Sequence, residues 1–237
     1  MTEHTGGVRT PAEIIADLLR ADAGRPRLTF YDEAEDERIE LSAAALFNWV
    51  AKAANLLVEE CDAEPGTGIG LRLPDGHWRT LYWALAIWST GATVDLAPGQ
   101  QGTTETVISA DPDEPADRLV LVTLPALVRA HPGPVPPGAL DEAAELSGYP
   151  DALPPLDRPA ADDIALRTAD HQVRYGDLVP TAPDGARVHV TGTGAAFLRR
   201  CLAVWAGDGS VVLVNGADPE TLARRLAEER VPPAATP

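Results

Sequence analysis

The run TGTG, from Thr191 to Gly194, is the first place in this chain where residue types and spacing suggest binding chemistry. It lies between an expected strand and an expected helix, and backbone N–H groups at the start of a helix can hold an anion. The dinucleotide-binding fingerprint also requires a third glycine, but position 197 is Phe. Thr191, Gly192, Thr193 and Gly194 are therefore candidate ligand-binding residues, with a tight turn as the competing interpretation.

A further candidate ligand-binding residue is His171, which stands in the segment TADHQVRYGDL at 168–178. Together with Arg174 and Tyr175, it could form a separate polar site. The alternation of Val173 and Tyr175 with polar residues instead favours a short hairpin. The sequence leaves both interpretations open.

None of the common catalytic patterns is present. The sequence has no GxSxG elbow, no HExxH, no paired-cysteine motif and no P-loop ending in GK[ST]. The acidic runs at 32–40 and 111–117 lack the features of a calcium loop and favour solvated turns. The five histidines are scattered, and His77 suits a surface or capping role. We therefore expect no metal site and no cofactor, and catalytic residues cannot be assigned.

Composition argues against several classes of function. Acidic residues outnumber basic ones by 36 to 19 in 237 residues, which gives a formal charge of −17. Such a surface repels phosphate backbones, so we expect no nucleic-acid partner. No stretch approaches the roughly 20 apolar residues of a membrane span, so we expect no membrane insertion. The start of the chain has no apolar signal core, and Cys61 and Cys201 have the apolar neighbours of reduced cysteines, which predicts a cytoplasmic protein.

Hydrophobic spacing predicts the elements that position the candidate residues. In the first part of the chain these are a helix at 11–19, strands at 28–31 and 38–41, a helix after the cap Ser42, a strand at 69–73, a helix at 78–88 and a strand at 92–96. The helix after Ser42 has one buried stripe, and its opposite, solvated face carries Asn48, Lys52, Asn55 and Glu59. Lys52 is the only lysine in the chain, and a solvated role is the simplest interpretation. Gly91 stands where a left-handed helix cap is expected.

Strands separated by helices predict an α/β fold with a mainly parallel sheet flanked by helices. Residues 1–130 form the first expected unit. Residues 131–163 are a connector, with eight prolines between 132 and 159 and one short helix near 139–146. Residues 164–237 form a smaller α/β unit that we expect to pack on the same sheet, so that the chain is one compact domain.

Four segments carry a resemblance to a known family. They are YDEAEDERIELSAAALFNWVAKAANLL at 31–57, EPGTGIGLRLPDGHW at 64–78, LAIWSTGATVDLAP at 85–98, and the strand, turn and helix pattern from ARVHVTGTG onward at 186–231. Their order resembles the N-terminal subdomain of the AMP-binding, adenylate-forming superfamily, which includes acyl-CoA synthetases. The chain also resembles a group of short relatives from high-GC bacteria, of unestablished function, that keep this scaffold without its motifs.

The resemblance implies what chemistry to expect. DIALRT at 163–168 occupies the place of the strand that leads into the superfamily's phosphate loop, which is rich in serine, threonine and glycine and carries a lysine. Here the following residues hold one glycine, no serine and no lysine. A full adenylate-forming enzyme would also continue beyond VPPAATP at 231–237 into the rest of its large domain and a mobile lid, so adenylation by this chain alone is not expected.

The sequence therefore predicts a non-adenylating binding or interaction protein on a degenerate AMP-binding-enzyme scaffold. A homodimer or another protein is a possible partner, and a small acyl or nucleotide compound is a possible ligand. The alternative is an enzyme of acyl-CoA or nucleotide metabolism that uses a new site or completes its active site with a second chain.

Overall fold

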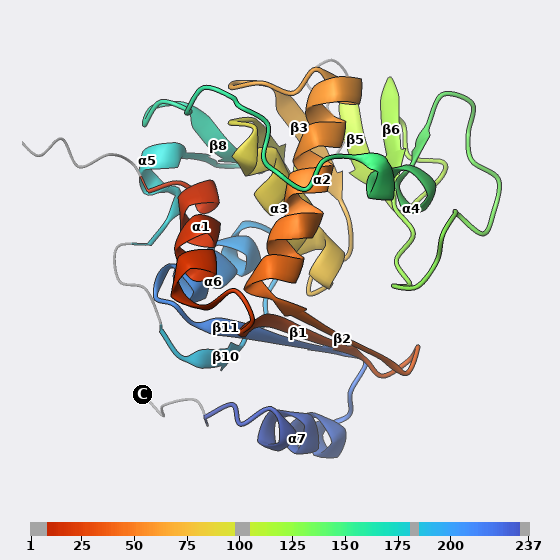
Figure 1. Ribbon diagram of the computed structural model, residues 1–237. Coiled ribbons are helices and arrows are strands. Elements are labelled where there is room, and N and C mark those ends of the chain that lie inside the picture. Colours follow the sequence, from red (N-terminus) through yellow and green to blue (C-terminus); the bar gives the residue numbers. More distant parts are fainter. Residues whose placement is uncertain (1–8, 98–104, 181–184, 233–237) are drawn as a thin grey trace, which may run out of the picture.

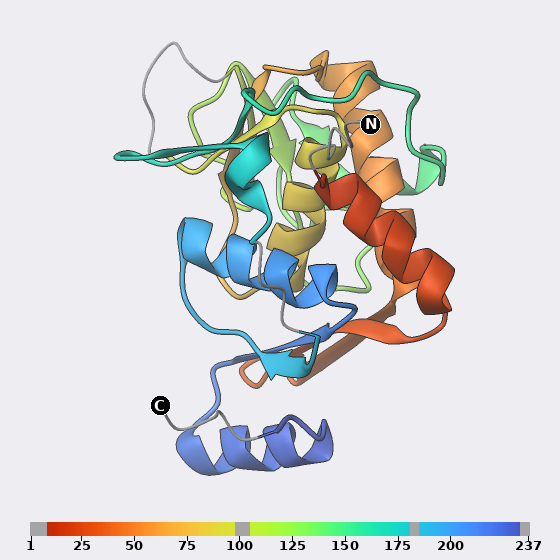
Figure 2. The same cartoon turned by 90° about the vertical axis from the view of Figure 1, so that its left-hand side faces the viewer.

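Two β-sheets with a layer of helices between them make up the fold (Figure 1). The computed structural model describes residues 9–97, 105–180 and 185–232. The helices of the central layer are α1 (Pro11–Asp22), α2 (Ala43–Cys61), α3 (Trp78–Ser89) and α6 (Gly194–Ala206). Helix α7 (Pro219–Glu228) lies on the outer side of the smaller sheet, as Figure 2 shows from a second direction.

The larger sheet has seven strands. In spatial order they are β7 (Leu140–Asp141), β6 (Arg118–Leu121), β5 (Thr106–Ser109), β3 (Gly68–Arg72), β4 (Thr93–Asp95), β8 (Ile164–Arg167) and β9 (Gln172–Arg174). All neighbouring pairs are parallel except β8 and β9, which form an antiparallel hairpin. Parallel neighbours need crossover connections, and α3 supplies the one between β3 and β4.

The smaller sheet has the order β10 (Arg187–His189), β11 (Ser210–Asn215), β1 (Pro26–Asp32) and β2 (Glu37–Ser42). Only β1 and β2 pair antiparallel, and Phe30 of β1 stands opposite Leu213 of β11. The predicted α/β fold with a mainly parallel sheet flanked by helices is confirmed. Strands that follow residue 163 divide between the sheets, because β8 and β9 join the larger one and β10 and β11 the smaller one.

Local sequence signals fix the ends of the central helices. Thr10 and Glu13 form a capping box at α1, and the Ser42 hydroxyl accepts from the Ala45 amide at the start of α2. After α3, Gly91 has φ +79°, which confirms the predicted left-handed cap. Between these ends α2 packs against α3, and α3 is the more deeply buried of the two helices.

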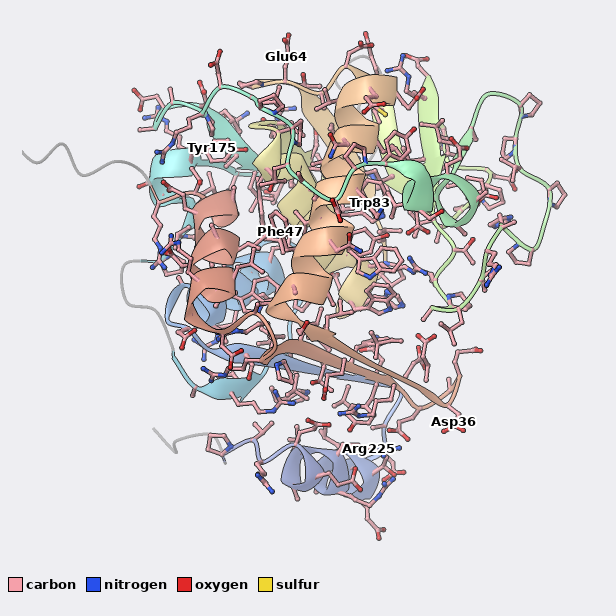
Figure 3. The ribbon with its side chains drawn as sticks, viewed as in Figure 1. Asp36, Phe47, Glu64, Trp83, Tyr175 and Arg225 are labelled. Atoms are coloured by element: carbon pink, nitrogen blue, oxygen red, sulfur yellow. The ribbon has the colours of Figure 1, made fainter. Side chains whose placement is uncertain are left out.

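Helix α3 is the centre of the core. Every residue from Trp78 to Trp88 is buried, because the helix lies between the two sheets and against α1 and α2. Trp83 is labelled among these helices in Figure 3. Across the described ranges, no helix has the length and apolarity that a membrane crossing requires.

The described residues also include three short helical segments: α4 (Glu142–Glu145), the 3₁₀ turn η1 (Leu146–Gly148) and α5 (Tyr175–Leu178). The first two confirm the predicted short helix in the connector. The predicted hairpin around His171 is confirmed as β8 and β9, but it ends at Arg174. Tyr175 instead begins α5, where its buried hydroxyl donates to the Ala92 carbonyl at 2.7 Å.

Candidate ligand-binding site

A cavity of about 540 Å³ opens between α2, α3 and the segment that runs from β6 to η1. Cavities of this size commonly accommodate small molecules. Its lining combines an indole ring, three cationic side chains, one carboxylate and several small or apolar groups: Asn48, Trp49, Lys52, Arg79, Val128, Arg129, Glu142, Ala143, Ala144, Leu146 and Ser147.

Arg79 contributes a buried positive charge to this lining, with 1% of the residue exposed. Its Nη1 donates to Glu142 Oε1 at 2.6 Å and to the Tyr82 hydroxyl at 3.3 Å. Its Nε and Nη2 donate to the carbonyls of Leu124 and Pro125, both at 3.0 Å. A buried charge without partners is costly, so these bonds explain how an arginine can occupy an otherwise apolar helix.

Glu142 supplies the opposite charge and is also 1% exposed. Its Oε1 accepts from both Arg79 and the Tyr82 hydroxyl, whereas its buried Oε2 has no hydrogen-bond donor of normal geometry among the described residues. Burial raises the pKa of the Glu142 carboxyl, while the Arg79 charge, the Tyr82 hydroxyl and the backbone of Thr123 oppose that shift. The opposite charges of Arg79 and Glu142 therefore cancel inside the wall of the cavity.

Two aromatic rings also contact the Arg79 guanidinium. Arg79 Cζ lies 4.5 Å from the centre of the Trp78 ring and 5.6 Å from that of Trp49. The Trp49 ring meets Trp78 edge-on at 5.4 Å and Tyr82 at 5.3 Å. Cation–π contacts of this kind are stronger when they are desolvated. Trp49 is half-buried and lines the cavity, so the same contacts fix the position of one cavity wall.

Lys52 and Arg129 are the two remaining cations. Lys52 Nζ donates to the carbonyls of Ser147 at 2.9 Å and Tyr149 at 2.5 Å, which ties α2 to the end of η1. An ammonium group has three donors, so one is left. Arg129 is exposed, and its guanidinium makes no hydrogen bond or ion pair with the described residues.

The connector covers the face of α2 that carries these groups. Asn55 is 7% exposed, and its amide donates to the carbonyls of Pro150 at 3.2 Å and Ala152 at 2.8 Å. The prediction of a solvated face is therefore wrong for Asn55, whereas Lys52 is only partly buried. Both side chains donate hydrogen bonds to backbone carbonyls of the proline-rich connector. These carbonyls belong to residues outside helices and strands or at the end of η1, so they need partners from elsewhere.

The TGTG run lies elsewhere, at the start of α6. Gly192 has φ +114° and Gly194 has φ +53°, which explains why glycine suits both positions. The Gly194 amide donates to Asp75 Oδ1 at 2.7 Å, so a carboxylate of this chain already occupies the place predicted for an anion. A ligand role for Thr191, Gly192, Thr193 and Gly194 stays a prediction.

His171 lies in the turn of the β8–β9 hairpin. Its amide donates to the Thr168 hydroxyl at 3.0 Å, and its carbonyl accepts from the Thr168 amide at 2.8 Å. No hydrogen bond joins His171 to the TGTG run within the described residues, and neither lines the cavity. Its role as a ligand-binding residue stays a prediction.

Sequence reasoning missed Arg79 and Glu142. One signal was available for Arg79, because a charged residue within the apolar run WRTLYWALAIW needs a buried partner. Nothing in the sequence identifies Glu142 as that partner among 36 acidic residues. His77 has the capping role, one of the two predicted for it, since its Nδ1 accepts from the Arg79 amide at 3.2 Å, but it is buried and not on the surface. No cluster of three or more metal-ligating side chains occurs within the described part of the chain.

Comparison with known proteins then places the chain in a family. No protein-family model matches it. A TIGR03089 family protein of Mycobacterium tuberculosis is 33% identical over 233 residues, which cover 92% of this chain and 94% of the relative. The chain belongs to the TIGR03089 family. That name describes membership and no activity.

Solved structures show which fold this TIGR03089 family protein shares. An acyl-CoA synthetase of Brucella canis matches with a TM-score of 0.71 and 12% identity over 93% of this chain and 46% of its own. The N-terminal subdomain of Klebsiella oxytoca NpsA, in complex with 3-hydroxybenzoyl-AMSN, matches with a TM-score of 0.63 and 13% identity over 98% and 60%. The likeness confirms the predicted fold of an adenylate-forming N-terminal subdomain, and the chain spans less than two thirds of either structure.

Proposed function

We propose that this TIGR03089 family protein is a non-adenylating binding protein built on the scaffold of an adenylate-forming N-terminal subdomain. The observation that carries the proposal is the β8–β9 turn. The sequence resemblance aligns β8 with the strand that leads into the superfamily's phosphate loop, and in this chain β8 is followed at once by a hairpin turn.

The chemistry of this turn differs from that of a phosphate loop. A phosphate loop needs free backbone amides and a cation near them. Here the amides of Thr168 and His171 already donate within the turn, and Asp170 adds a negative charge at its tip. Lys52, the only lysine, bonds to carbonyls of the connector instead. These contacts favour binding without activation of ATP.

Calorimetry and a pyrophosphate-release assay test the proposal together. We expect no saturable binding of ATP, and no release of pyrophosphate when ATP is offered with a panel of carboxylic acids and CoA. AMP, CoA and acyl-CoA complete the calorimetric panel. Saturable ATP binding together with pyrophosphate release would overturn the proposal and favour an enzyme of acyl-CoA or nucleotide metabolism.

The proposal includes a protein partner, either a second copy or another chain, and a cytoplasmic location. A homodimer is the simplest form, and light scattering of the purified chain would measure it. The edges of the larger sheet are short, with two residues in β7 and three in β9. A dimer would therefore have more contact area on helices or loops than on those two edges.

A further inference from the structure

The cavity between α2, α3 and η1 differs in charge from the molecule that carries it. Three cationic side chains and one carboxylate line the cavity, whereas the whole chain has a formal charge of −17. Arg79 and Glu142 neutralise each other inside the wall. Lys52 and Arg129 remain, and neither forms an ion pair with the described residues. The cavity thus has two positive charges without an ion-pair partner in the described part of the chain.

Both cations are placed so that an anion could reach them. Lys52 Nζ is fixed by two carbonyl acceptors and retains one donor for a ligand. Arg129 is exposed, and its planar guanidinium, which binds none of the described residues, suits the two oxygens of a carboxylate or sulfonate. Because Glu142 is paired with Arg79, Lys52 and Arg129 determine the charge that a ligand meets, and their donors match one carboxylate or sulfonate group.

The rest of the lining suits a flat apolar group. Trp49 presents part of its ring, and Val128 and Leu146 contribute aliphatic surface. Contacts with Arg79 and Tyr82 hold the indole in place, so little side-chain freedom would be lost when a ligand stacks on it. Aromatic pairs add to the energy of area burial.

We propose that this cavity binds a small organic anion that carries one negative charge on a planar apolar body. Lys52 and Arg129 bind the charged end, and the planar body packs on Trp49. The inference rests on the proposed binding function, and it adds the position of the site and the chemical class of the ligand.

Calorimetry with matched probes tests the inference. Naphthalene-2-sulfonate and 2-naphthoate carry one charge on the same planar body, naphthalene-2-sulfonamide removes the charge, and methanesulfonate removes the body. We expect both planar anions to bind saturably at one per chain. The sulfonamide should bind about tenfold or more weakly, as expected from the loss of a charge-assisted hydrogen bond. Methanesulfonate should show no measurable binding.

Variants connect the probes to the named residues. Arg129→Gln, which lies on an exposed segment, should weaken naphthalene-2-sulfonate binding about tenfold and leave sulfonamide binding unchanged. Trp49→Leu should weaken both. Arg224→Gln is the matched control, since it removes the same charge from α7 on the far side of the smaller sheet.

Two outcomes would overturn the inference: equal binding of the sulfonate and the sulfonamide, or an unchanged affinity in Arg129→Gln. These binding measurements use no ATP. Pyrophosphate release would therefore contradict the proposed function, but the probe experiments could still be interpreted. Absence of binding by every probe would likewise reject this ligand class while leaving the non-adenylating proposal in place.

Discussion

His77 shows how a single buried side chain couples stability to pH. It caps α3 through Nδ1, and its ring lies 4.7 Å from that of Phe30. Burial, and after it the Arg79 charge, lower the pKa of the imidazole from 6.5 to about 4, against a smaller effect of Asp32. The folded chain therefore keeps His77 neutral under conditions in which the unfolded chain protonates it.

This difference predicts a loss of stability in acid. Between pH 6.5 and 4 the unfolded state binds more protons at this site, so the free energy of unfolding decreases as pH falls. The shift corresponds to about 3 kcal/mol over that window. In His77→Asn, which keeps a cap acceptor, urea unfolding at pH 7, 6, 5 and 4.5 should show a shallower decrease than in the wild type.

The control for this experiment is His171→Asn, the same replacement in the exposed β8–β9 turn. Its unfolding free energy should follow the wild-type pH profile. If His77→Asn and the wild type lost stability in parallel from pH 7 to 4.5, burial of a neutral imidazole at position 77 would be rejected.

At the level of elements, the contact between Gly91 and Pro65 fixes α3 against the start of β3. A Cβ atom on Gly91 would lie 2.9 Å from Pro65 Cγ and 3.3 Å from its Cα. Gly138 has a similar backbone, with φ +83° against +79°, but a Cβ there would meet nothing within 4 Å. The two glycines separate the effect of backbone conformation from that of packing.

Alanine substitutions make this a quantitative prediction. Gly138→Ala should lower the free energy of unfolding by about 1 kcal/mol, since only the positive φ is unfavourable. Gly91→Ala should lower it by about 2–3 kcal/mol, because Pro65 must also move. Urea denaturation of both variants measures the difference. If both variants lost the same free energy of unfolding, the close approach of Pro65 would add nothing to the effect of Gly91→Ala.

The sequence predicts the elements around this contact well. Apolar periodicity and local caps define α2 and α3, because both signals act over a few neighbouring residues. The alternating pattern predicts Tyr175 in a hairpin, but the structure has it in α5, where its hydroxyl donates to the Ala92 carbonyl. That bond joins residues 83 positions apart, and no local pattern reports it.

The cavity is harder to predict for the same reason. Its lining comes from α2, α3, the β6–β7 connection, α4 and η1, and only the tertiary fold brings these together. Lys52 and Asn55 have the sequence pattern of a solvated helix face, yet both donate to carbonyls of the connector. Gly192 and Gly194 have the pattern of a glycine-rich turn and adopt it, but the acceptor at Gly194 is Asp75, 119 positions away.

At the scale of the whole molecule, interactions of charged side chains are the main contacts that attach α7 to the smaller sheet. None of the residues of α7 is buried. Arg225 pairs with Glu33 at 2.7 Å and stacks over the Tyr31 ring at 4.6 Å; Figure 3 labels it on the side of α7 that faces the sheet. Just after the helix, Glu229 accepts from the Tyr31 hydroxyl at 2.5 Å and pairs with Arg38 at 3.0 Å. Partly exposed pairs of this kind are sensitive to salt.

We therefore predict that α7 opens independently of the core. Raising NaCl from 0.1 to 1 M shortens the screening length from about 10 to about 3 Å, and should speed amide hydrogen exchange in α7 while leaving α2 unchanged. Arg225→Gln should speed exchange in α7 at low salt. Arg224→Gln, whose ion pair lies within the helix, should have little effect. Equal responses of α7 and α2 would show that the helix opens only with the whole fold.

The pairing of β1 with β11 also sets the order in which the molecule can fold. Arg27 is fully buried in β1, and its Nη1 donates to the Asp208 carbonyl, 181 positions further along the chain. Non-local pairing slows folding, and unpaired apolar strands favour aggregation. During synthesis the first strand is made early, but its parallel neighbour is complete only when Asn215 has been added. A nascent chain of this protein must therefore keep an unfinished sheet shielded, by its own helices or by a chaperone, through most of its translation.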